Sequence, residues 1–82
     1  MTTAQRIREM ASSVLGDERR FGVFSTGEKI AVALVLDRRD LLAKVNGGYT
    51  MLEAVERLGP EWLRAALQVQ RAGIAQPDGA SP

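Results

Sequence analysis

The chain contains one uninterrupted run of seven apolar residues, Ile30 to Leu36, and this run most constrains its fold. A segment that is apolar on every face must be covered on most sides, as a buried helix or as an inner strand. It is too short to span a bilayer, which takes about 20 apolar residues. The rest of the 82-residue chain must supply the cover. At this size folding buries only about 60% of the unfolded surface, so the margin of stability is thin.

Two interpretations of residues 20–36 are open. In the first, Ser25 and Glu28 form a capping box, and a central helix runs from about Thr26 to Leu36. In the second, residues 25–28 are the turn of a β-hairpin, which the β-branched Val32 and Val35 support. The alanines and leucines of the run favour a helix, and a lone hairpin needs further cover. We therefore expect the helix.

The segment before this run predicts an amphipathic helix over residues 2–15. Thr2 or Thr3 can cap its first turn, and Gly16 is the expected stop. Its apolar residues recur at helical spacing and form one stripe: Ile7, Met10, Ala11, Val14 and Leu15. A polar connection over residues 17–20 follows. We expect the two aromatic side chains after it, Phe21 and Phe24, to insert beneath the helices.

The segment after the run predicts a short helix over residues 38–45. Asp37 has the position of its N-cap, with Leu36 and Leu41 spaced as a hydrophobic staple. Asn46-Gly47-Gly48 is a strong turn signal and ends this helix.

Two further helices are expected at the C-terminal end. Thr50 and Glu53 have capping-box spacing, which predicts a helix over residues 51–58. Its expected inward residues are Met51, Leu52, Val55 and Leu58. Gly59-Pro60 breaks that helix and starts another, because proline is favoured in a first turn. The last helix, residues 60–72, should direct Trp62, Leu63, Ala66, Leu67 and Val69 to the core, and Gly73 should end it. We predict one all-α domain of four to five short helices over residues 1–73, and a flexible tail over residues 74–82.

The composition limits the kinds of catalysis and metal binding that this chain could perform. The chain has no cysteine and no histidine, which excludes thiolate nucleophiles, the commonest general base and the commonest transition-metal ligand. The carboxylate pairs Asp37 with Asp40 and Glu53 with Glu56 are better explained by helix starts than by a metal. The glycines match no phosphate-binding motif. We expect no metal, no cofactor and no enzymatic activity.

Nucleic-acid binding is the alternative function. Residues 50–71 have a helix–turn–helix outline whose second helix presents side chains of the kinds that read bases, Arg64, Gln68 and Arg71. Two arginine pairs offer phosphate contacts, Arg19 with Arg20 and Arg38 with Arg39. Against this, Glu61 in the first turn would repel phosphate. Eleven basic and ten acidic residues leave a net charge of only +1.

Protein interaction is the leading hypothesis. The last helix is apolar over a broader arc than one neighbour in a small bundle can cover. Trp62 and Tyr49, with Arg38, Arg39, Arg64, Gln68 and Arg71, are the expected partner contacts, because aromatic and arginine side chains anchor interfaces. Trp62 has an equally simple role as the largest core residue. A homodimer, or a complex with a larger protein, would bury the surplus at the last helix or at Ile30–Leu36.

The sequence also suggests the kind of organism that encodes this chain and the cellular compartment in which it acts. Nine of eleven basic residues are arginine, which points to a GC-rich bacterial genome, and the first ten residues lack the apolar core of a signal peptide. We expect a cytoplasmic protein. The segments GEKIAVALVL, GYTMLEAVERLGPEWL and AALQVQRA resemble small proteins of bacterial plasmids and integrative elements. The resemblance names no family and transfers no functional residue, but it suggests an accessory protein of a mobile element.

Overall fold

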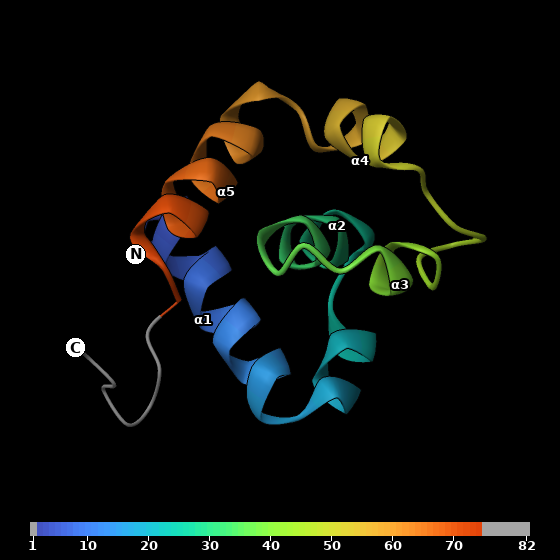
Figure 1. Cartoon of the computed structure of the whole chain (residues 1–82), viewed down its shortest axis with the longest axis horizontal. Coiled ribbons are helices and arrows are strands. Elements are labelled where there is room, and N and C mark those ends of the chain that lie inside the picture. The colour runs from blue at the N-terminus through green and yellow to red at the C-terminus, as the bar shows by residue number, and fades with distance from the viewer. Residues whose placement is uncertain (1, 75–82) are drawn as a thin grey trace.

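The computed structural model describes residues 2–74, which fold into five α-helices and one 3-10 helix, with no strand in this range (Figure 1). The predicted all-α class is confirmed, and the hairpin alternative is wrong. In chain order the elements are α1 (Thr3–Gly16), η1 (Glu18–Val23), α2 (Thr26–Val35), α3 (Arg39–Leu42), α4 (Met51–Leu58) and α5 (Pro60–Ala72). The predicted tail lies, apart from Ile74, outside the described residues.

Helix α2 is the centre of the bundle. It begins at the predicted capping box, in which the Ser25 hydroxyl accepts from the Glu28 amide at 3.3 Å and the Glu28 carboxylate accepts from the Ser25 amide at 2.9 Å. Residues 30–33 are almost completely buried, and Val35 is 5% exposed. Helices α1, α3, α4 and α5 all pack against α2, which lies in the middle of the ring they form (Figure 1). The chain thus covers most of its apolar run, although Leu34 and Leu36 are only partly buried.

The end of α2 differs from the sequence prediction. Asp37 is not an N-cap: its φ of 57° places it in the left-handed region, directly after the helix. The Asp37 amide donates to the Leu34 carbonyl at 3.1 Å, and the Arg38 amide donates to the Ala33 carbonyl at 2.9 Å. This pair of bonds is the Schellman arrangement, in which one left-handed residue closes the helix. Asp37 therefore ends α2 and does not begin α3.

Helix α3 is shorter than predicted. It spans four residues, begins at Arg38 without a side-chain cap, and continues as a turn through Val45. Leu41, Leu42 and Val45 are all buried, so the segment anchors the connection to the core although it is helical only in part. Asn46, at φ 43°, donates from its side chain to the Thr26 hydroxyl at 2.8 Å and ties the turn to the start of α2.

The N-terminal elements follow the prediction with three changes. Thr2 caps α1 in a capping box with Gln5, and Gly16 is the last residue of the helix, with Asp17 as its C-cap. The segment expected as a polar connection is the start of η1. Phe21 is buried, as predicted, whereas Phe24 is only partly buried against the core. Leu15, expected in the inward stripe of α1, is 52% exposed.

Helices α4 and α5 have the predicted bounds but different inward faces. In α4 the buried residues are Ala54 and Leu58, whereas Leu52, predicted inward, is 82% exposed. In α5 the buried residues are Ala65, Ala66 and Val69. Leu67, also predicted inward, is 40% exposed. Both leucines are thus exposed: Leu67 lines a hollow with Met51, and Leu52 lines an adjoining hollow that Met51 also lines.

Candidate docking groove

An apolar groove lies where α4 and α5 cross α2. Its floor comes from the end of α2, and its two walls come from α4 and α5. We call it the docking groove, and its lining residues are Leu34, Val35, Asp37, Met51, Val55, Leu63, Ala66, Leu67 and Gln70. It encloses about 220 Å³. An engineered apolar cavity of about 150 Å³ binds benzene, so this groove has room for a leucine-sized side chain.

Helical spacing explains why these side chains converge. Leu63, Leu67 and Gln70 recur on one face of α5, and Met51 and Val55 are one turn apart on α4. The two helices are joined by Gly59 alone, whose φ of 86° is in the left-handed region. This sharp corner lets α4 and α5 leave each other at once and lie over different parts of α2 (Figure 1). The apolar space between them remains open to solvent.

Gln70 fixes one end of the groove. Its side-chain amide donates to the carbonyl oxygens of Leu34 and Val35, each at 3.3 Å. The last carbonyls of a helix lack partners within the helix. The Gln70 amide supplements the Asp37 amide at the Leu34 carbonyl, gives the Val35 carbonyl a donor, and links α5 to the end of α2. The sequence analysis did not select Gln70, because its partners are 35 and 36 residues away.

A second hollow, of about 560 Å³, lies next to the docking groove. It is lined by Arg39, Leu42, Tyr49, Thr50, Met51 and Leu52. Met51 lines both hollows, so the apolar surface continues from the docking groove to Leu52 across α4. The broad apolar arc predicted for residues 60–72 was the sequence signal for this surface. What the sequence did not reveal is that α4 supplies its other half.

The predicted contact residues do not form one site. Tyr49 and Arg39 line the second hollow, next to the docking groove. Trp62, partly buried against the core, lines a separate small hollow with Arg57 at the start of α2. Arg64 and Gln68 face the first residues of α1. Arg71 is exposed at the end of α5, beside neither Trp62 nor Tyr49. The residues that were expected to contact one partner therefore lie on several faces of the molecule.

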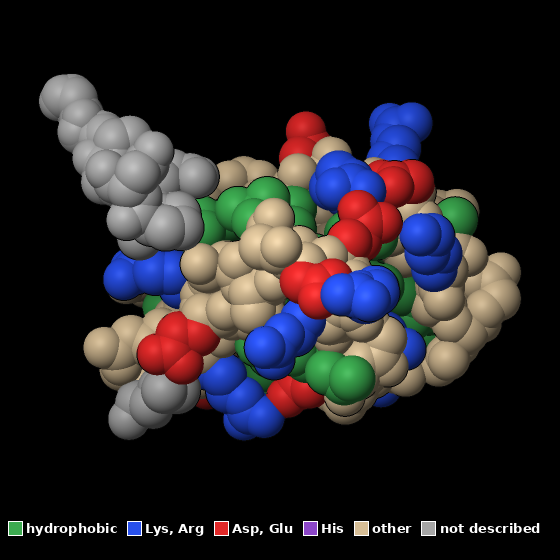
Figure 2. All heavy atoms as spheres, turned by 90° about the horizontal axis from the view of Figure 1, so that it is seen from below, with side chains coloured by type: hydrophobic (Ala, Val, Ile, Leu, Met, Phe, Trp, Pro, Cys, Tyr) green, Lys and Arg blue, Asp and Glu red, His purple; other side chains and the backbone are tan. Residues whose placement is uncertain are grey.

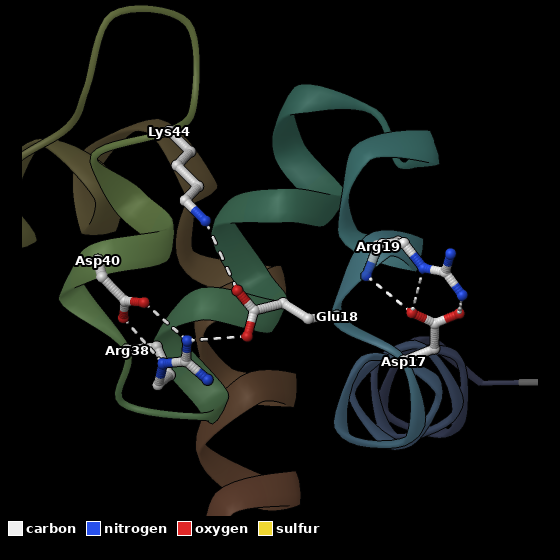
Figure 3. A network of polar contacts seen from close by, with 6 residues as sticks. All are labelled: Asp17, Glu18, Arg19, Arg38, Asp40 and Lys44. Atoms are coloured by element: carbon white, nitrogen blue, oxygen red, sulfur yellow. Dashed lines mark hydrogen bonds and ion pairs between the residues drawn. The ribbon is translucent and has the colours of Figure 1, made fainter.

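Arg38 is engaged within the chain (Figure 3). Its guanidinium donates to both carboxylate oxygens of Asp40, at 2.8 and 2.7 Å, and to Glu18 at 3.1 Å. Lys44 approaches the other oxygen of Glu18 at 3.5 Å. The hydrogen bonds from Arg38 lower the pKa of Asp40 to about 2. Arg38 therefore lies at the surface but is paired with two carboxylates of its own chain, and its expected role as a partner contact stays a prediction.

Arg19 is held in the same way by its neighbour. It donates to Asp17 from its side chain at 3.0 and 3.1 Å, and these bonds lower the pKa of the Asp17 carboxyl (Figure 3). On the face of the molecule drawn in Figure 2, basic and acidic side chains are interspersed. Phosphate binding needs several uncompensated cations on one surface. The face therefore lacks the electrostatic pattern of a nucleic-acid interface.

The structure also differs from a helix–turn–helix in the connection between α4 and α5. A helix–turn–helix joins its helices by a turn of three to four residues, whereas α4 and α5 are joined by Gly59 alone. Arg64, Gln68 and Arg71 are all exposed on α5, as a recognition helix would require. Glu61 is exposed in the first turn of the same helix and lines the hollow that Arg64 and Gln68 line.

No protein-family model, curated protein or solved structure matches this chain. Within residues 2–74, no group of three or more acidic, cysteine or histidine side chains is placed to hold a metal ion. In the same range no helix is long and apolar enough to cross a membrane. The chemistry of the docking groove is then the strongest guide to function.

Proposed function

We propose that this protein is a non-catalytic interaction module that binds a protein surface in the docking groove. The observation that carries the proposal is the groove itself, an open apolar hollow bounded by side chains such as Leu34, Val55 and Leu67. Apolar grooves rimmed by polar side chains are among the surface features that mark interaction sites. The partner is a larger protein or a second copy of the chain.

We place this module in the cytoplasm of a bacterium, as a regulatory accessory of a mobile element. The arginine-rich composition and the resemblance noted in the sequence support this placement. Binding to another protein requires a complementary shape and apolar area, and it does not require a nucleophile or a general base. This function is therefore compatible with a chain that has no cysteine and no histidine.

Site-specific photo-crosslinking tests the proposal. A photoreactive amino acid in place of Leu67, at the wall of the groove, should give a discrete covalent adduct with a protein in the cells that make this chain. The matched control is the same amino acid in place of Leu15, which is 52% exposed against 40% for Leu67 and does not line the groove. Absence of an adduct from position 67, or equal labelling from both positions, would contradict the proposal.

A further inference from the structure

We infer that the docking groove binds an amphipathic helix of another protein, and that this helix places an acidic side chain in the second hollow, against Arg39. The inference rests on the proposed function and names the chemistry of the partner. Three observations carry it: the helices that form the groove, the hollow that adjoins it, and the charges that line the two.

The groove is of the kind that accepts a helix. It lies between α4 and α5, with the end of α2 as its floor, and its lining is apolar apart from Asp37 and Gln70. An amphipathic helix binds by laying its apolar face into such a groove. An extended peptide would instead pair with an open sheet edge, and residues 2–74 contain no strand. Proline-rich peptides dock in aromatic-lined grooves, and no aromatic side chain lines this one.

The second hollow extends the surface on which a helix can lie. The two hollows share Met51, so a helix that covers the docking groove also passes the second hollow. Residues one turn apart on a helix project from the same face, about 5–6 Å from each other. One residue of the partner therefore enters the groove, and a residue one turn away reaches the second hollow.

Arg39 gives the second hollow its preference for an acidic side chain. It is exposed there, and no ion pair joins it to another residue within 2–74. Its neighbours Arg38 and Lys44 are, by contrast, paired with carboxylates of this chain. A guanidinium can donate two hydrogen bonds to one carboxylate. The hollow is otherwise lined in part by Leu42 and Met51, and removal of water next to such side chains strengthens an ion pair.

Asp37 decides which hollow takes which side chain. It is exposed and lines the docking groove, whereas Arg39 lines the second hollow. An acidic residue of the partner in the groove would face a carboxylate of the same sign, which electrostatic complementarity disfavours. The groove therefore takes a leucine-sized apolar side chain of the partner, and the second hollow takes the acidic one.

The end of the chain is a poor alternative occupant. Residues 75–82 contain no leucine, isoleucine, valine, methionine or aromatic residue. Their composition offers no apolar side chain large enough for the groove.

Selection from a random peptide library on the immobilised full chain tests the chemistry of the partner. Peptides long enough for about four helical turns should be enriched when they carry a leucine-like residue and, one turn away, Asp or Glu. Leu67→Glu should enrich none of them, and the matched control Leu15→Glu should enrich the same set. No enrichment by the wild-type chain, or a shared pattern without an acidic residue, would overturn the inference.

Charge reversal tests the contact with Arg39. With a helical far-UV spectrum retained, Arg39→Glu should bind the most enriched peptide at least ~10-fold more weakly in a fluorescence-anisotropy titration. It should select Lys or Arg at the place of the acidic residue. The control is Arg20→Glu, which has the same net charge but lies on η1 and lines neither hollow. Equal weakening by the two variants, or an unchanged selection by Arg39→Glu, would show that the contact is wrong.

A proline tests the conformation of the bound peptide. Proline at the centre of the most enriched peptide should abolish its binding, because proline breaks a helix in its interior. Unchanged binding of the proline peptide would overturn the helical partner.

The crosslinking experiment separates the two proposals. An adduct from position 67 with another protein, together with a selection that lacks the acidic residue, keeps the interaction module and overturns the inferred partner. An adduct with the mass of two chains also keeps the module and overturns this partner. No adduct contradicts the interaction module, and with it the inference.

Discussion

Asp37 shows how a single residue can have two plausible roles in a sequence and only one in the fold. Its position before a helix indicates an N-cap, yet it is the left-handed residue that closes α2. Left-handed backbone is disfavoured for residues with a Cβ, although aspartate tolerates it better than most. The choice between the two roles depends on how α3 leaves α2, which local sequence does not determine.

This conformation predicts the effect of a glycine. Asp37→Gly should raise the free energy of unfolding by about 0.5–1 kcal/mol, because glycine adopts positive φ without steric cost. The control is Ala43→Gly, at a φ of −65°, where glycine only adds flexibility and should cost about the same amount. Urea denaturation at low micromolar concentration measures both. A loss of stability in Asp37→Gly would contradict the assigned role.

The ion pair of Asp40 with Arg38 predicts a pH dependence. The pKa of Asp40 falls from an ordinary 3.8 to about 2, so its pairing contributes stability above about pH 4 that is lost as the pH falls towards 2. Asp40→Asn should therefore lower the melting temperature at pH 7 and narrow its gap to wild type as the pH decreases from 4 to 2. Thermal melts across this range measure the difference. A gap that is constant or widens towards pH 2 would show that the pair does not form.

At the scale of the elements, the capping boxes explain the starts of three helices. Thr2, Ser25 and Thr50 each accept from the amide three residues on, and the Gln or Glu at that position bonds back. Such motifs depend on four consecutive residues, which is why the starts of α2 and α4 could be predicted. The end of α2 and the inward faces of α4 and α5 are set by neighbouring elements, and there the predictions for Asp37, Leu52 and Leu67 were wrong.

The central position of α2 predicts which truncations matter most. Ile30→Ala should lower the free energy of unfolding by about 2–5 kcal/mol, because its fully buried side chain would leave a cavity. Trp62→Ala should cost less, about 1–3 kcal/mol, since the indole is only partly buried. Leu52→Ala, at 82% exposure, should change stability by less than about 0.5 kcal/mol. Chemical denaturation at low micromolar concentration gives all three values, and a Trp62 cost above that of Ile30 would place the indole in the core.

At the scale of the whole molecule, the bundle covers most of its apolar run. Within Ile30–Leu36, residues 30–33 are buried inside the bundle, whereas Leu34 and Val35 line the docking groove. Apolar surface is exposed at the docking groove, at Leu52 in the first turn of α4, and at Val23 and Leu15. Any association should depend on the part of that surface at the docking groove.

The charge distribution predicts weak binding to nucleic acid. The net charge is only +1, and Arg6, Arg19, Arg38 and Lys44 are paired to carboxylates, so cations that could displace counterions are nearly balanced by acidic side chains. Titration with nonspecific duplex DNA at about 150 mM salt should give a dissociation constant weaker than about 100 µM. Tight binding that weakens steeply as salt rises would favour the DNA-binding alternative, with α5 as its recognition element.

The sequence by itself determined the all-α class, the bounds of α4 and α5 and the central place of α2. Capping boxes and the glycine–proline break act over a few residues, and a fully apolar run can be stable only when covered. Tertiary structure alone decided the role of Asp37, the exposure of Leu52 and the existence of the docking groove. The groove exists because Gly59 turns α5 away from α4 while Gln70 holds α5 to the end of α2. Contacts between residues so far apart in the chain are fixed by packing, and no local pattern encodes them.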